Sequence, residues 1–129
     1  MLDTFKMWMA LDQLHSTLNQ ELEHFLKSNY NLTVSEFMTI TRLSDAPDHG
    51  LTIDQLSKMV NLSHSAVSRL VVRLETCHTI ERRSNEQDRR STLVQLSESG
   101  KRDYQAILPG IVSVIQDVMK RNPVAITLS

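Results

Sequence analysis

The stretch N-L-S-H-S-A-V-S-R-L-V-V-R-L-E-T, which runs from Asn61 to Thr76, decides the fold. Four apolar side chains recur in it at i, i+3, i+4 and i+7, a spacing that gathers them on one helix face: Val67, Leu70, Val71 and Leu74. The hydroxyl of Ser63, just ahead of them, can accept a free backbone N–H at the helix start. The stretch therefore predicts an amphipathic helix over residues 63–76 whose apolar face must be buried.

The opposite face of this helix carries hydroxyls, guanidinium groups and one valine: Ser65, Arg69, Val72 and Thr76, with Ser68 and Arg73 at its edges. Serine and arginine can donate hydrogen bonds to phosphates and base edges in the DNA major groove. An ordinary solvated surface helix would show the same pattern. For this stretch alone, both interpretations stay open.

Length and composition indicate a single domain outside any membrane. A chain of 129 residues can bury one core, and no apolar run approaches the ~18 residues of a membrane span. Acidic and amide residues interrupt the N-terminal segment, so a secretory signal is not expected and the protein should stay in the cytoplasm, at the nucleoid. The single cysteine, Cys77, cannot form an internal disulfide, and the scattered histidines predict neither a metal site nor a cofactor.

Charge is unevenly distributed along the chain, although the net charge is only −1. From Lys58 to Arg102 there are nine Lys and Arg residues against five acidic residues, a net of +4. The rest of the chain carries five basic and ten acidic residues, a net of −5. A basic central segment in an acidic frame is typical of a local anion-binding surface.

The residues before the central helix predict three more helices. Leu2 to about Ser28 keeps a three-to-four apolar spacing without glycine or proline. Thr33 with Glu36, and Thr52 with Gln55, are capping boxes for helices that end near Leu43 and Val60. The second of these should turn four side chains inward: Ile53, Leu56, Met59 and Val60. With the central helix it forms a helix-turn-helix.

After Thr76 the pattern changes to short strands at 79–83 and 91–96, joined by a charged tip over residues 84–90. A helix-turn-helix followed by such a hairpin is a winged helix, and a basic tip suits an A·T-rich minor groove. A solvated hairpin is the alternative. Ser97 can cap a last helix from Glu98 to about Lys120, in which Pro109-Gly110 predicts a kink or a break.

The order and the amino-acid sequences of four segments resemble those of the MarR family of bacterial winged-helix regulators. The segments are L-T-V-S-E-F from Leu32, H-S-A-V-S-R-L-V-V-R-L-E from His64, I-E-R-R-S-N-E-Q-D-R-R from Ile80 and V-Q-L-S-E-S-G from Val94. The expected fold is mainly α (α+β), one domain over 1–129. A winged helix-turn-helix at 32–97, with its wing at 79–96, would lie between helices at 1–31 and 98–121. The resemblance implies that these flanking helices dimerise.

The resemblance implies a homodimeric repressor on a pseudo-palindromic operator in double-stranded DNA, with the central helix in the major groove and the wing in the minor groove. By the same resemblance Ser65, Ser68 and Arg69 contact the operator, and Arg90, oriented by Asp88, makes the wing contact. The complete set of expected DNA-binding residues is Ser63, His64, Ser65, Ser68, Arg69, Arg73, Arg82, Asp88, Arg89 and Arg90. A small-molecule effector is a further partner that the resemblance implies, and Trp8, His15 and Tyr30 are candidates for lining its pocket.

Two positions depart from the family pattern. Val72 stands where an aspartate commonly helps to fix the wing arginines, so it either loosens the wing or meets a thymine methyl group. His78 stands where the family has glycine, at a cost if that position needs a positive φ.

Other functions are weighed against this one. The acidic frame and Val72 favour a winged helix that binds another protein, as an anti-regulator, while the arginine-rich wing does not. An enzyme is not expected, because no catalytic triad, phosphate loop or metal spacing is present. Cys77 is a candidate redox switch, but its place near the negative end of a helix dipole favours an inert cysteine.

Overall fold

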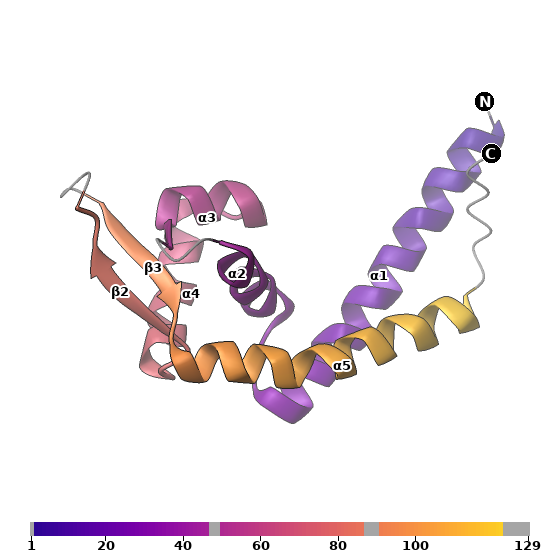
Figure 1. Cartoon of the computed structure of the whole chain (residues 1–129). Coiled ribbons are helices and arrows are strands. Elements are labelled where there is room, and N and C mark those ends of the chain that lie inside the picture. Colours follow the sequence, from indigo (N-terminus) through magenta and orange to yellow (C-terminus); the bar gives the residue numbers. More distant parts are fainter. Residues whose placement is uncertain (1, 47–49, 87–90, 123–129) are drawn as a thin grey trace. The chain divides into compact units, whose positions relative to one another are not determined.

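The structure is a computed structural model that describes residues 2–46, 50–86 and 91–122 (Figure 1). The chain divides into two compact units. The terminal unit comprises Met1–Val34 and Leu108–Ser129, and the central unit comprises Ser35–Ile107. The predicted helix-turn-helix and wing, 32–97, fall in the central unit except for their first three residues.

The order of elements is that of a winged helix, as predicted: α1 (Leu2–Tyr30), α2 (Val34–Asp45), β1 (Leu51–Thr52), α3 (Ile53–Val60), α4 (His64–Thr76), β2 (Ile80–Ser84), β3 (Thr92–Leu96) and α5 (Glu98–Arg121). None of the described helices combines the length and the apolar character that crossing a bilayer requires.

Local capping sets the helix-turn-helix of the central unit. The backbone N–H of Gln55 donates to Thr52 Oγ1 at 3.1 Å, and Gln55 Oε1 accepts from the N–H of Thr52 at 2.9 Å, which completes the predicted capping box of α3. Asn61 ends α3 in the left-handed conformation, with φ 57°. Ser63 then caps α4 by accepting the N–H of Ala66 at 3.1 Å. A three-residue turn therefore separates the two helices.

A three-stranded antiparallel sheet, in the order β1-β3-β2, completes the central unit. The hairpin pairs Ile80 with Leu96 and Ser84 with Thr92, and it forms the paired arrows of Figure 1. β1 was not predicted, and it pairs Leu51 with Val94 on the other side of β3. This strand ties the segment before α3 to the wing.

The core of the central unit draws on every helix and strand of that unit except β1, with buried apolar side chains at Phe37, Ile40, Leu43, Leu56, Val67, Val71, Leu74, Ile80, Val94, Leu96, Tyr104 and Ile107. The rings of Phe37 and Tyr104 stack with centroids 5.7 Å apart. Burial of α4's apolar stripe was predicted and is confirmed for three of its four members, while Leu70 is half-buried. The inward position predicted for Met59 is wrong, since its side chain is 42% exposed.

The terminal unit packs α1 with the second part of α5. Its buried side chains are Leu14, Leu26, Ile111 and Val118. A Cβ at Gly110 would overlap the ring of Phe25, so glycine permits a close approach of the two helices there. Arg121 Nη2, at the end of α5, lies 3.3 Å from Oε1 of Glu21, one turn before Phe25 in α1.

α5 runs without a break through Pro109, so of the predicted kink or break at Pro109-Gly110 the break is wrong. Proline removes the one backbone bond that would reach the carbonyl of Gln105, and Gln105 is an exposed residue. Ile107 before the proline and Ile111 after it are both buried, each in its own unit. Packing therefore outweighs one missing hydrogen bond.

Candidate nucleic-acid interface

The outer face of α4 is a continuous exposed stripe. Along it Ser65, Arg69, Val72 and Thr76 are exposed, and Ser68 beside them is half-buried. On the opposite face Val67, Val71 and Leu74 have no exposed surface. The predicted division of the helix into a buried and a polar face is thus present, and we refer to Ser65, Arg69, Val72 and Thr76 as the outer stripe.

Arg69 is the cation of the outer stripe. Its residue is exposed, and among the described residues its guanidinium group has no hydrogen bond or ion pair. Five N–H donors in a fixed planar arrangement are therefore available to a phosphate or to the paired acceptors of a guanine.

The first turn of α4 holds Ser63, His64 and Ser65, all exposed. The Ser63 hydroxyl is used by the helix itself through the N–H of Ala66, and it lies 3.4 Å from the Ser65 hydroxyl. The positive end of the helix dipole adds to the attraction of this turn for an anion. His64 and Ser65 are thus the side chains of the turn that can reach outward.

Arg73 is engaged inside the central unit. Its guanidinium Nη1 donates to Glu36 Oε2, an ion pair that connects α4 to α2 across 37 positions of sequence. The Glu36 side chain is only 5% exposed, whereas that of Arg73 is 40% exposed. The sequence predicts that Glu36 belongs to a capping box with Thr33, and no local sequence pattern indicates that Glu36 pairs with Arg73.

Arg82 also has a carboxylate partner. Its Nε lies 3.1 Å from Glu75 Oε1, and both side chains are at least one-third exposed. A pair so exposed to water contributes little to stability and can exchange for a phosphate. The pair holds the start of β2 against the end of α4.

The predicted wing contacts Asp88, Arg89 and Arg90 lie outside the described residues. The described part of the hairpin presents Arg82 and Arg83, both exposed, on β2.

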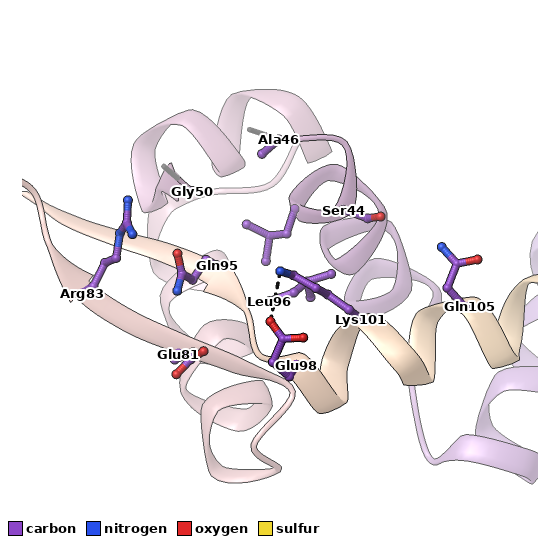
Figure 2. A pocket seen from close by; sticks show the side chains of 11 residues that line it. Ser44, Ala46, Gly50, Glu81, Arg83, Gln95, Leu96, Glu98, Lys101 and Gln105 are labelled. Atoms are coloured by element: carbon purple, nitrogen blue, oxygen red, sulfur yellow. Dashed lines mark hydrogen bonds and ion pairs between the residues drawn. The ribbon is translucent and has the colours of Figure 1, made fainter. Parts of the chain in front are cut away.

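A polar cavity of about 460 Å³ lies elsewhere on the central unit, between the end of α2, the sheet and the start of α5 (Figure 2). Charged groups of both signs line it, from Glu81 and Arg83 on β2 to Glu98 and Lys101 on α5. Lys101 Nζ lies 3.4 Å from Glu98 Oε1, the dashed line in Figure 2. None of the expected DNA-binding residues that the structure describes lines this cavity.

Of the candidates for an effector pocket, Trp8 and Tyr30 are exposed on α1, and His15 lines an open depression on the same helix.

A hydrogen-bonded junction connects the end of α4 to the start of α5. Cys77, exposed, ends α4, and His78 follows with φ 61°, the positive φ at which the family pattern has glycine. The hydroxyl of Ser97 lies 2.6 Å from the carbonyl oxygen of His78, and Ser99 Oγ donates to the same oxygen at 3.1 Å. Ser97 also accepts the N–H of Gly100 at 2.9 Å, so it caps α5 as predicted.

The described part of the chain groups no three His, Cys, Asp or Glu side chains that could hold a metal ion.

Comparisons with known proteins identify the family. The MarR family model matches residues 30–91. Two relatives come from Bacillus subtilis strain 168. The HTH-type transcriptional repressor YetL is 26% identical, and the match covers 91% of this chain and 70% of YetL. The uncharacterized HTH-type transcriptional regulator YdcH is 30% identical, and the match covers 87% of this chain and 74% of YdcH. The crystal structure of Sco3205, a MarR family transcriptional regulator from Streptomyces coelicolor in complex with DNA, superposes with a TM-score of 0.83 at 19% identity, over 94% of this chain and 76% of the other. The chain belongs to the MarR family of winged helix-turn-helix transcriptional regulators.

Proposed function

We propose that the protein is a homodimeric, sequence-specific DNA-binding regulator that represses transcription. In this proposal α4 enters the major groove and the wing enters the adjacent minor groove. The observation that carries the proposal is the outer face of α4, where an exposed Arg69, without a partner among the described residues, stands among serine hydroxyls on a helix held by its buried face. Repression is supported by the relative YetL, and DNA binding by the relative Sco3205.

The site residues differ in the roles we propose for them. His64, Ser65, Ser68 and Arg69 contact DNA directly. Ser63 positions the first turn of α4, and Arg73 fixes α4 to α2 through Glu36. Arg82 exchanges Glu75 for a phosphate, and Asp88, Arg89 and Arg90 serve the wing contact.

Dimerisation through the terminal unit is supported by its exposed apolar side chains. On α1 they cluster before Leu14, with Leu2 at 66%, Phe5 at 57% and Trp8 at 60% exposure. On the second part of α5 the side chains of Val112, Ile115 and Met119 are also exposed. Apolar surface of this extent on two helices favours association, and a second copy supplies the same surface in return.

The proposal gives the protein no catalytic role and places it in the cytoplasm, bound to the nucleoid. The alternative of a protein-binding anti-regulator is favoured by no observation within the described residues.

Selection of bound sites from random double-stranded DNA by the full chain tests the proposal. We expect a pseudo-palindrome whose two half-sites are separated by about 10–10.5 bp or a multiple of it. Affinity for the selected site should fall steeply with salt, since each phosphate contact contributes about 0.9 to the slope of log K against log salt concentration. Recovery of no common sequence, together with no salt-dependent binding, would refute the proposal.

A further inference from the structure

Val72 is the apolar member of the outer stripe of α4. It is 51% exposed, whereas Val67 and Val71 of the same helix are fully buried. Valine also forms helix less readily than alanine, so neither helix stability nor packing among the described residues explains this side chain at an exposed mid-helix position. Single exposed apolar residues are ordinary on protein surfaces, and what distinguishes Val72 is its place directly in line with Arg69.

The outer stripe changes character along its length. Its first half presents hydrogen-bonding groups, the Ser65 hydroxyl and the Arg69 guanidinium group, which has no partner among the described residues. In its second half the hydroxyl of Thr76 donates to the carbonyl oxygen of Val72 at 2.9 Å, so it is used within the helix. Around Val72 the stripe therefore presents carbon rather than hydrogen-bonding groups.

We propose that the Val72 side chain contacts the C5 methyl group of a thymine and so selects thymine at one position of each half-site. This inference rests on the proposed function. The thymine methyl is the apolar group that base pairs display in the major groove, which makes it the matching partner for an exposed isopropyl group. Burial of the two against each other removes apolar surface from water on both sides.

The selected thymine is expected in the same half-site as the group that Arg69 contacts, because Val72 lies only three residues beyond Arg69, about 4.5 Å along the helix axis.

Deoxyuridine scanning of the selected operator tests the inference, because uracil pairs as thymine does but lacks the methyl group. Each thymine is replaced in turn, and binding is measured with wild-type protein and with Val72→Ala. For wild type we expect one position in each half-site at which uracil lowers affinity about three- to fivefold, as for loss of one buried methyl group. For Val72→Ala the ratio of thymine to uracil affinity at that position should fall to about one.

Two control variants separate the methyl contact from other effects. Met38→Ala shortens a 40% exposed apolar side chain of α2, outside the proposed dimer and DNA-binding surfaces, and it should keep the wild-type thymine-to-uracil ratio. Val72→Thr retains one methyl group and should give an intermediate ratio. Alanine favours helix, so Val72→Ala is not expected to unfold α4.

The outcomes distinguish failure of the Val72–thymine contact from failure of the proposed DNA-binding function. Specific binding with the same uracil response in wild type and Val72→Ala overturns the Val72 contact and leaves the proposed function standing. A selected half-site without thymine overturns the contact in the same way. Failure to bind any DNA specifically refutes the proposed function, and the thymine contact with it.

Discussion

Helices α1 and α4 share the same kind of sequence pattern, but the apolar face of α4 is buried and that of the first turns of α1 is exposed. Both carry apolar residues at three-to-four spacing. In α4 the stripe of Val67, Val71 and Leu74 has no exposed surface, whereas over the first three turns of α1 the apolar side chains are exposed. Only Leu14 and Leu26 are buried among the 29 residues of α1.

The difference shows that periodicity identifies which face of a helix is apolar but not which molecule covers it. The stripe of α4 is covered by its own chain, so its polar face is the one left for a partner. Over the first three turns of α1 the described residues leave the stripe uncovered, which is where we propose that a second copy packs. Mutations in the two stripes should therefore affect different quantities, folding stability for α4 and self-association for α1.

The largest effect is expected in the buried stripe of α4. Leu74→Ala removes a fully buried side chain and should lower the free energy of unfolding by about 2–5 kcal/mol. Met59→Ala, at a 42% exposed site of the same unit, should change it by less than about 0.5 kcal/mol. Urea titration followed by circular dichroism measures both, and equal losses would contradict the assignment of α4's core face.

The exposed stripe of α1 should affect association instead. Phe5→Glu with Trp8→Glu places two charges on the proposed dimer face and should weaken self-association at least about a hundredfold, or about 2.7 kcal/mol, because the charges would be desolvated. Ser16→Glu with Asn19→Glu adds the same charge to exposed polar positions of α1 and serves as the control. Sedimentation over a concentration range measures the dimer fraction. An unchanged dimer fraction in the Phe5→Glu, Trp8→Glu variant would show that this face of α1 lies outside the dimer interface.

The outer face of α4 should affect DNA binding without affecting folding. Arg69→Ala should reduce affinity for the operator about tenfold and lower the slope of log K against log salt concentration by about 1. Lys120→Ala removes the same charge at an exposed position of α5 and should leave the slope unchanged. Gel-shift titrations at several salt concentrations measure both variants. Equal slopes for Arg69→Ala and wild type would exclude a phosphate contact at Arg69.

Arg73 should behave differently from Arg69. Glu36→Gln keeps the shape of the buried side chain but removes its charge, and it should cost about 1 kcal/mol of unfolding free energy, a value reduced by the solvent exposure of Arg73. A double-mutant cycle with Arg73→Gln measures the coupling between the two residues. Coupling near zero, with a reduced salt slope in Arg73→Gln alone, would instead make Arg73 a phosphate contact.

The smallest effect is expected at Cys77. Cys77→Ser should change operator affinity by less than about twofold, since the exposed thiol ends α4 and belongs to none of its buried contacts. Gel-shift titration with and without peroxide provides the measurement. Peroxide sensitivity in wild type that disappears in Cys77→Ser would establish a redox switch.

Features that depend on neighbouring residues could be predicted from the sequence. The capping box at Thr52, the cap at Ser63 and the buried face of α4 follow from contacts within four residues, and all three are present. For His78 the sequence indicated only that histidine, in place of the family's glycine, would be unfavourable if the position required a positive φ. The observed φ of His78 is 61°.

Features that depend on distant residues could not be predicted. β1 has two residues, too few for a periodic signal, and it exists because Leu51 pairs with Val94. Glu36 matches a capping pattern, but the ion pair with Arg73 is made by a residue 37 positions away. At Pro109-Gly110 the local rule predicted a kink or a break, and the break is absent, since Gly110 lies against the ring of Phe25 inside a continuous helix.

The junction at His78 has a consequence for regulation. The first turn of α5 hydrogen-bonds to the backbone directly after α4, and a Cβ at Gly100 would overlap the carbonyl oxygen of Thr79, so this turn cannot rotate alone. Any rotation of it must either break these bonds or turn the end of α4 with it. A reorientation of the start of α5 that keeps these bonds would therefore also turn the end of α4, the helix that we propose enters the major groove.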